Sequence, residues 1–131
     1  MQRRDLRRLG DDKTWGGLGA DKLMGGAGAD TFVFKAKAES ISTARDTIYD
    51  FSSKQGDRID LSGFDAYEAK AGIQDFNFIG TKGFSGKAGE LRYETKANDS
   101  YVYADTNRDK KADFVLHFDD KISFVTGDFL F

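Results

Sequence analysis

Residues 16–33 contain two consecutive nonapeptides, Gly16-Gly17-Leu18-Gly19-Ala20-Asp21-Lys22-Leu23-Met24 and Gly25-Gly26-Ala27-Gly28-Ala29-Asp30-Thr31-Phe32-Val33. Both fit the pattern G-G-x-G-x-D-x-U-x, in which U is a large apolar residue. Residues 7–15 give a degenerate first line, in which Arg7 and Arg8 replace the glycine pair and Thr14 replaces the apolar residue. A flexible Gly-rich linker would not keep these columns in register, so the pattern predicts the stacked turns of a β-roll.

The turns of these repeats supply oxygen ligands for a cation. Glycine reaches the positive φ angles that tight turns need, and Ca²⁺ takes about six to eight oxygens from carbonyls and carboxylates. Alternation along the last three residues of a repeat turns the middle one inward, which places Leu23 and Phe32 in the core and Val33 outside it. The predicted Ca²⁺ ligands come from the glycine and aspartate columns: Gly10, Asp12, Gly16, Gly17, Gly19, Asp21, Gly25, Gly26, Gly28 and Asp30.

Loops on the same side of a two-sided roll are two repeats apart in the sequence. Loop 7–12 is therefore expected to stack on loop 25–30, with Asp12 and Asp30 facing one Ca²⁺ ion. Loop 16–21 belongs to the other side and has no Gly-rich partner downstream, because residues 34–39 contain no glycine. Asp46 or Asp50 is a candidate to complete that site, and the alternative is that both are solvated acids at a strand edge.

A second candidate site has the spacing of the first, third, fifth and ninth ligand positions of an EF-hand loop. Lys110 stands where such a loop has glycine, and Leu116 stands where it has glutamate. The sequence therefore favours a polar hairpin turn over a metal site here. The tentative ligands are Asp105, Asn107, Asp109 and Asp113.

Composition excludes several classes of protein. The 131 residues include no cysteine and no proline, so disulfides and thiolate metal sites are ruled out. The formal net charge is −2, from 20 basic and 22 acidic residues, and indicates no nucleic-acid partner. There is no apolar run of about 18 residues for a membrane span and no apolar N-terminal signal segment, so no stable membrane insertion is expected.

The chain after the repeats predicts short strands. Their β-branched and aromatic residues are separated by Gly, Asn, Asp or Ser, at 31–35, 46–51, 58–61, 76–79, 90–95, 100–105, 113–118 and 127–131. Residues 66–71 are the best candidate for a helical turn, and Asp57 and Asp60 are interpreted as strand-end acids. The predicted fold is all-β, with residues 1–6 as a flank, residues 7–33 as a short parallel β-roll and residues 34–131 as a β-sandwich that continues it.

Several motifs together resemble the C-terminal domain of serralysin-type (M10) metalloproteases and related RTX secreted proteins. They are Gly25–Phe34, Asp46–Phe51, Gly56–Ser62, Phe84–Tyr93, Asp105–Asn107 and Ala112–Phe114. The resemblance covers residues 10–131 and implies a calcium-stabilised β-roll joined to a β-sandwich. It also implies an extracellular protein that a type I secretion transporter exports by reading the C-terminus. The terminal acidic and apolar residues that match that signal are Asp128, Phe129, Leu130 and Phe131.

Nothing in the sequence supports catalysis. His117 is the single histidine, and neither H-E-x-x-H nor G-x-S-x-G is present, so His117 is expected to be a hydrogen-bonded strand residue. The leading hypothesis is a non-catalytic, monomeric module that folds on binding Ca²⁺ outside the cell. The alternative is a module that binds an alginate-like polysaccharide, with Lys13 and Lys22 among the residues that contact the polyanion.

Overall fold

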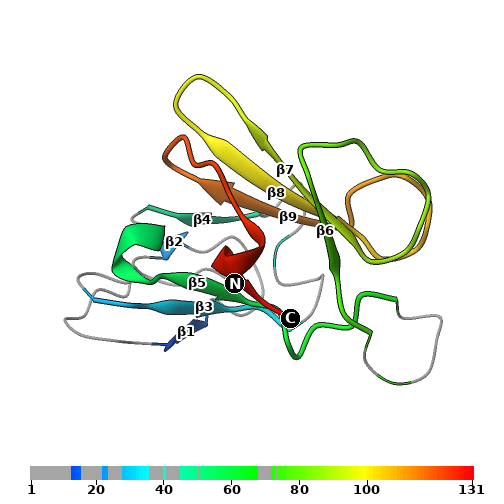
Figure 1. Cartoon of the computed structure of the whole chain (residues 1–131), viewed down its shortest axis with the longest axis horizontal. Helices are drawn as coiled ribbons and strands as arrows, with labels where there is room; N and C mark the ends of the chain where they lie inside the picture. Colours follow the sequence, from blue (N-terminus) through cyan, green and yellow to red (C-terminus); the bar gives the residue numbers. More distant parts are fainter. Residues whose placement is uncertain are drawn as a thin grey trace.

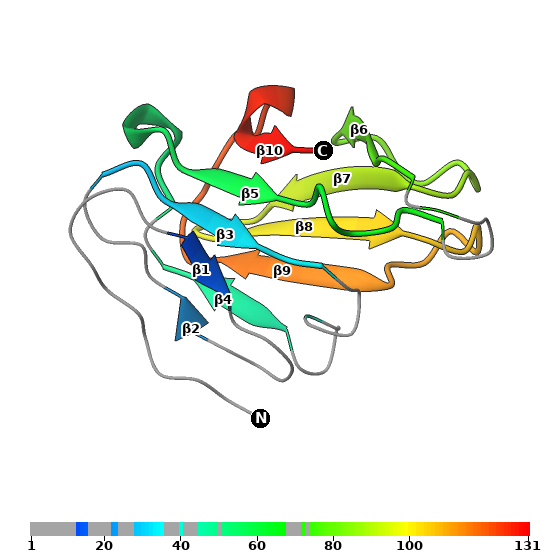
Figure 2. The same cartoon turned by 90° about the horizontal axis from the view of Figure 1, so that it is seen from below.

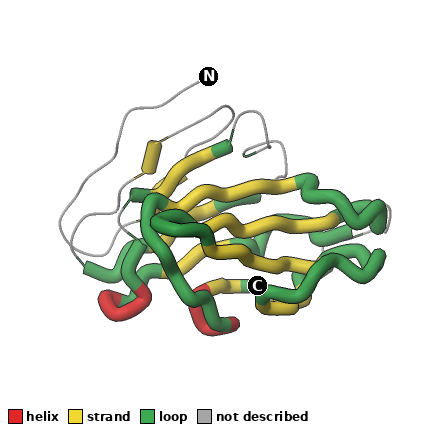
Figure 3. The backbone as a smooth tube through the Cα atoms, turned by 90° about the horizontal axis from the view of Figure 1, so that it is seen from above, coloured by secondary structure: helices red, strands yellow, loops and turns green. Residues whose placement is uncertain are grey.

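The computed structural model describes residues 13–15, 22–23, 28–35, 40, 45–49, 51–67, 72 and 74–131. Regular structure within these ranges consists of short strands and two 3-10 turns (Figures 1 and 3). The strands are β1 (Lys13–Trp15), β2 (Lys22–Leu23), β3 (Thr31–Val33), β4 (Asp46–Ile48), β5 (Arg58–Asp60), β6 (Asn77–Gly80), β7 (Glu90–Thr95), β8 (Ser100–Asp105), β9 (Phe114–Phe118) and β10 (Phe129–Leu130). The 3-10 turns are η2 (Ser53–Gln55) and η3 (Thr126–Asp128).

The strands form two sheets that face each other (Figures 1 and 2). One is an entirely parallel sheet of four strands in the order β1-β3-β5-β10. The other has six strands in the order β2-β4-β9-β8-β7-β6, with antiparallel pairing of β8 to both β7 and β9 and parallel pairing elsewhere. The predicted all-β class is confirmed.

The register of the repeat strands is that of a roll. Lys13 of β1 pairs with Thr31 of β3 in parallel, so the paired residues are two nonapeptides apart. The repeat strand between them, β2, joins the opposite sheet, where Lys22 pairs with Thr47 of β4. Successive repeats therefore alternate between the two sheets, as the sequence predicts.

Strands from the rest of the chain extend the same two sheets. β5 pairs with β3, and β10 pairs with the far side of β5, with Phe129 opposite Ile59. Two repeats alone would leave rows of unpaired backbone N–H and C=O groups at the strand edges. The later strands satisfy those groups, so the roll and the sandwich share one pair of sheets.

A single aromatic-rich core fills the space between the sheets. Leu23 and Phe32, the predicted inward residues of the repeats, are both fully buried. Phe51 links them to the later strands, because its ring contacts those of Phe32, Phe118 and Phe124 at centroid distances of 6.4, 5.5 and 5.7 Å.

Val33, which the sequence places outside the core, is nevertheless buried. Its side chain lies outside the main core cluster but is only 4% exposed. β3 is an interior strand with β1 on one side and β5 on the other, so Val33 does not lie at a sheet edge.

The predicted helical turn at 66–71 is not seen at Ala66 and Tyr67, and residues 68–71 lie outside the described ranges. The Oδ1 atom of Asp65 accepts hydrogen bonds from the N–H groups of Tyr67 and Gln74, both at 3.0 Å. The N–H of Ala66 donates to the carbonyl of Gln74. These bonds close a loop, because an aspartate side chain competes with the helical hydrogen-bond pattern.

Candidate metal centre

Asp30 and Asp57 occupy the same position before two neighbouring parallel strands. Thr31 pairs with Arg58, so the residues just before them are equivalent. The N–H of Asp30 donates to Oδ1 of Asp57 at 2.8 Å, and the N–H of Arg58 donates to the carbonyl of Asp30 at 2.9 Å. Both aspartates are buried, at 0% and 1% exposed. Two carboxylate-bearing turns are thus stacked at the start of the parallel strands.

Glycine allows these turns to approach each other. Gly28 and Gly56 adopt φ angles of +97° and +90°, in the left-handed region that residues with a side chain rarely enter. A Cβ atom on Gly56 would also lie 3.1 Å from the Cβ of Ala29. The glycine column of the repeat therefore has a conformational reason at Gly28, whereas Gly56 is aligned with Ala29 and is needed for the close approach of the two turns.

Sequence reasoning missed the role of Asp57. It was interpreted as a strand-end acid, but both of its carboxylate oxygens accept backbone N–H groups, Oδ1 from Asp30 and Oδ2 from Ser52, each at 2.8 Å. The sequence does contain a sign of this role. Asp57 follows Asp30 by 27 residues, which is three repeat lengths, and Ile59 follows Phe32 by the same distance. The absence of a glycine pair before Asp57 hides that periodicity.

Asp46 is the corresponding buried acid of the second sheet. It starts β4, and the residue after it, Thr47, pairs with Lys22 of β2. In the repeat pattern the residue just before Lys22 is the aspartate, so Asp46 holds the equivalent position. Its side chain is 0% exposed, which contradicts the alternative of a solvated strand-edge acid. The N–H of Asp46 donates to the hydroxyl of Ser40 at 2.8 Å, and that hydroxyl donates to the carbonyl of Val115.

The donor chemistry at these positions fits a calcium ion. A buried carboxylate is costly unless hydrogen bonds or a cation compensate its charge. Asp30 and Asp46 are completely buried, and the backbone of Gly28 offers a carbonyl as a further oxygen donor. The residues that would hold Ca²⁺ in the described part of the chain are Gly28, through its carbonyl, and Asp30, with Asp46 on the other sheet.

Many predicted ligands lie outside the described residues. The expected stacking of loop 7–12 on loop 25–30 therefore stays a prediction. These residues are Gly10, Asp12, Gly16, Gly17, Gly19, Asp21, Gly25, Gly26 and Asp50.

The EF-hand-like residues are brought together in the loop between β8 and β9. One carboxylate oxygen from each of Asp105, Asp109 and Asp113 lies within 4.8 Å of the others, and the side-chain amide of Asn107 faces all three. Asp105 is buried, whereas Asp109 is exposed. The geometry thus gathers the four tentative ligands around one point.

Hydrogen bonds within this loop already use its carboxylates. Asp105 accepts N–H groups from residues 107, 108 and 110 at 3.1, 2.9 and 2.9 Å, and Asp113 accepts the N–H of Thr106 at 2.8 Å. Arg108 and Lys110 have φ angles of +68° and +64°, and the aspartate contacts hold this turn. The loop joins two antiparallel strands, as a polar hairpin turn does.

Comparison with known families identifies the chain. The family described as "Peptidase M10 serralysin C terminal" matches residues 11–131. The chain belongs to the serralysin C-terminal family of M10 peptidases. The family name refers to the C-terminal part of those proteases. No curated protein sequence matches this serralysin C-terminal domain.

Two solved structures with similar folds are subunits of a mannuronan C5-epimerase from Azotobacter vinelandii. The AlgE6R2 subunit is 18% identical, with a TM-score of 0.58, and the match covers 98% of this chain and 91% of that subunit. The AlgE6R3 subunit is 22% identical, with a TM-score of 0.52, over 90% of this chain and 69% of that subunit. At these identities the likeness extends to the fold of the serralysin C-terminal domain.

The terminal residues of this serralysin C-terminal domain are part of the fold. Asp128 is buried, and its Oδ2 atom accepts the N–H of Val125 at 2.9 Å. Phe129 is 4% exposed and packs in the core, whereas Leu130 is 41% exposed. Of the predicted signal residues, Phe129 and Leu130 thus form the edge strand β10, and Asp128 lies in η3.

His117 of the serralysin C-terminal domain lies in β9 and is hydrogen-bonded, as its strand position predicts. Its Nδ1 atom is 3.0 Å from the hydroxyl of Thr47, and its Nε2 atom is 3.2 Å from Oδ1 of Asp99. Both partners come from other strands or turns, so the imidazole ties β4, β9 and the β7–β8 turn together. No helix among the described residues has the length and apolar character to cross a membrane.

Proposed function

We propose that this domain is a non-catalytic module that folds on binding Ca²⁺ outside the cell. The observation that carries the proposal is the stack of Gly-containing turns that holds the buried carboxylates of Asp30 and Asp57 at the start of parallel strands. Membership of the serralysin C-terminal family supports it.

The physical reason is the charge of the aspartate columns. Without a cation, aspartates at the stacked turns repel one another, and the turns gain little from closing. Extracellular calcium modules have dissociation constants of about 10⁻⁴–10⁻³ M, so cytoplasmic calcium leaves the repeats unfolded. Outside the cell, the free energy of binding becomes free energy of folding.

We further propose that the domain directs export by a type I secretion transporter. A chain that crosses a membrane unfolded gains from the absence of cysteine and proline, because neither disulfide formation nor slow isomerisation delays its refolding. The acidic and apolar residues at 128–131 are accessible to the transporter in the unfolded chain, and Phe129 and Leu130 become part of a sheet after folding.

The calcium proposal is tested by circular dichroism of the full chain in chelator and after addition of Ca²⁺. We expect β structure to be lost in chelator and regained with Ca²⁺. Asp30→Asn should raise the Ca²⁺ concentration at the folding midpoint by about tenfold, because one ligand charge is lost. Asp119→Asn, at an exposed acid, should leave the midpoint unchanged. A spectrum that does not respond to Ca²⁺ would discard the proposal.

The export proposal is tested with the same protein and its native transporter. Leu130→Asp changes an exposed apolar residue of the tail and should lower export while Ca²⁺-induced folding is kept. Val125→Asp makes the same change at a residue that is 60% exposed and lies outside the tail, so export should be retained. Equal export of both variants would count against the tail as the signal.

A second candidate function is binding of an acidic polysaccharide. Two similar folds are subunits of an enzyme named for mannuronan, and a groove lined by basic and aromatic residues lies on the outer face of the larger sheet. The side chains of Lys13 and Lys22, the contacts expected from the sequence, lie outside the described residues.

A further inference from the structure

The outer face of the larger sheet carries two rows of polar and aromatic side chains. In an antiparallel sheet the residues directly opposite each other share a face. One row contains Glu94 of β7, Tyr101 of β8, His117 of β9 and Thr47 of β4. The next row contains Arg92, Tyr103 and Val115.

The two tyrosines of this face form an aromatic platform with cations beside it. The rings of Tyr101 and Tyr103 are nearly parallel, with an interplanar angle of 6° and centroids 6.0 Å apart. Arg45 Cζ and Lys96 Nζ lie 5.5 and 5.4 Å from the centroid of Tyr101. Arg92 Cζ lies 5.3 Å from that of Tyr103. These distances are in the range of cation–π contact.

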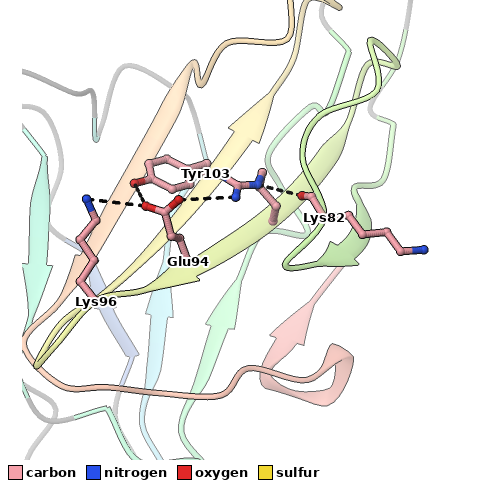
Figure 4. A network of polar contacts seen from close by, with 5 residues as sticks. Lys82, Glu94, Lys96 and Tyr103 are labelled. Carbon is pink, nitrogen blue, oxygen red and sulfur yellow. Dashed lines mark hydrogen bonds and ion pairs between the residues drawn. The ribbon is translucent and has the colours of Figure 1, made fainter.

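Glu94 contacts two of these cations, Lys96 and Arg92, as Figure 4 shows. Its carboxylate lies 3.7 Å from Nζ of Lys96 and 3.7 Å from Nη2 of Arg92, and it accepts a long hydrogen bond of 3.5 Å from the hydroxyl of Tyr103. Arg92 Nε also donates to the carbonyl of Lys82 at 2.8 Å. Burial, together with the negative charge of Glu94, raises the pKa of Tyr103, so the phenol remains a neutral donor at physiological pH.

A shallow groove of about 470 Å³ opens over this platform. The residues that line it are Arg45, Lys96, Tyr101, Tyr103, Ala112 and Val115. A concave site with an aromatic floor and a few fixed charged groups is the usual form of a small-ligand site.

We propose that this groove binds an acidic saccharide, a pyranose chain that carries carboxylate groups. This inference rests on the second candidate function and specifies its site and its ligand class. The apolar C–H face of a pyranose ring packs against aromatic side chains, and the parts of Tyr101 and Tyr103 that line the groove offer such a surface. Arg45 and Lys96 are then placed to pair with the sugar carboxylate, which a guanidinium can bind through two parallel hydrogen bonds.

The acids of the same face favour a sugar over a nucleic acid. The carboxylate of Glu94 lies 3.7 Å from Nζ of Lys96, and that of Asp99 lies 3.2 Å from Nε2 of His117. Sugar hydroxyls can donate hydrogen bonds to these carboxylates, whereas a phosphodiester backbone offers acceptors only and would be repelled. A ligand with both hydroxyl donors and carboxylate acceptors matches both sets of groups.

The test is calorimetric titration of the full chain, folded in Ca²⁺, with a short oligogalacturonate at constant free Ca²⁺. We expect Tyr101→Leu and Lys96→Glu each to weaken binding by about tenfold, since an aromatic contact or a charge-assisted contact is lost. Lys121→Glu is the matched control, because it makes the same charge change at an exposed lysine and should bind as the wild type does. Added salt should weaken binding of the acidic sugar.

The possible results of this titration distinguish the groove as the site, the ligand class and the second candidate function. Circular dichroism first establishes that each variant folds with Ca²⁺. If Tyr101→Leu does not fold, the test rests on Lys96→Glu, which changes an exposed side chain. Wild-type affinity in Lys96→Glu would overturn the groove as the site and leave the second candidate function standing. Equal binding of neutral cellohexaose, or binding of oligothymidylate in place of the uronate, would overturn the ligand class. A folded wild type that binds no uronate would overturn both the groove proposal and the second candidate function, and would leave the calcium proposal unaffected.

Discussion

Glu90 lies buried at the first position of β7, and its carboxylate anchors the preceding turn. Its Oε1 and Oε2 atoms accept hydrogen bonds from the N–H and the hydroxyl of Ser85, both at 2.7 Å. Burial alone would raise the pKa of Glu90, but these bonds, with the backbone N–H and positive charge of Lys87, outweigh burial and bring the pKa below its ordinary value of 4.5. The folded state therefore prefers the ionised acid.

Glu90→Gln should lower the free energy of unfolding by about 1–3 kcal/mol, because a charged acceptor of two hydrogen bonds is lost in a buried position. The contribution of Glu90 is complete above its unfolded pKa and is lost as pH falls through the lower folded pKa. Urea unfolding across the acidic pH range measures both effects. Asp120→Asn, at an exposed acid, is the control and should change neither the stability nor its acid dependence.

The residues that sequence reasoning found are those with a periodic signal. The repeat predicts Leu23 and Phe32 correctly as inward residues, because the nine-residue spacing sets their column. Glu90 has no such pattern around it, since its partner Ser85 is set by the local turn. The groove was also missed, because Arg45 and Tyr101 are 56 residues apart and meet only through sheet pairing.

Among the elements, the turn that precedes β7 depends on Gly89. This residue has a φ angle of +81°, and a Cβ atom there would lie 3.0 Å from the Cβ of Ala66 and 3.5 Å from the carbonyl of Asp75. Its N–H donates to the carbonyl of Asp105, and its own carbonyl accepts the N–H of Asn77, both at 2.7 Å. The turn therefore joins β6, β7 and β8 through their backbones.

Gly89→Ala should lower the free energy of unfolding by about 1–3 kcal/mol, because alanine is strained at positive φ and its methyl group meets fixed backbone and Ala66. Gly83→Ala is the matched control, since Gly83 lacks positive φ and has nothing within 4 Å of an added Cβ. Thermal unfolding in saturating Ca²⁺ compares the two. Equal melting temperatures would show that the turn relaxes around the methyl group.

Element boundaries were predictable where a strand has long antiparallel neighbours. β7 and β8 begin and end at the predicted residues, because the hairpin pairs all six residues of each strand. The predicted strand 31–35 ends earlier, at Val33, since its partner β5 ends at Asp60. The length of a parallel strand thus depends on its neighbour, which local sequence does not reveal.

At the scale of the whole molecule, the C-terminus closes the aromatic core. Phe129 contacts the rings of Phe78, Phe124 and Phe131 at centroid distances of 5.2, 5.7 and 5.9 Å. Phe124 in turn contacts Phe118 at 4.8 Å. The last segment therefore packs against both sheets of the fold.

Phe129→Ala should lower the free energy of unfolding by about 3–5 kcal/mol, because removal of a buried ring leaves a cavity between the sheets. Leu130→Ala, one residue further along, should cost about 0.5 kcal/mol or less, since its side chain is 41% exposed. Denaturant unfolding in Ca²⁺ measures the pair. Similar losses for the two variants would contradict the packing of the terminal strand.

The position of β10 beside β5 also fixes when folding can finish. The parallel sheet takes strands from residues 13–15 and residues 129–130, so a nascent chain that leaves the ribosome N-terminus first has its opening strands long before their last neighbour exists. The sheet cannot be completed during translation. The order of synthesis by itself delays closure of the domain until residue 130 has been made.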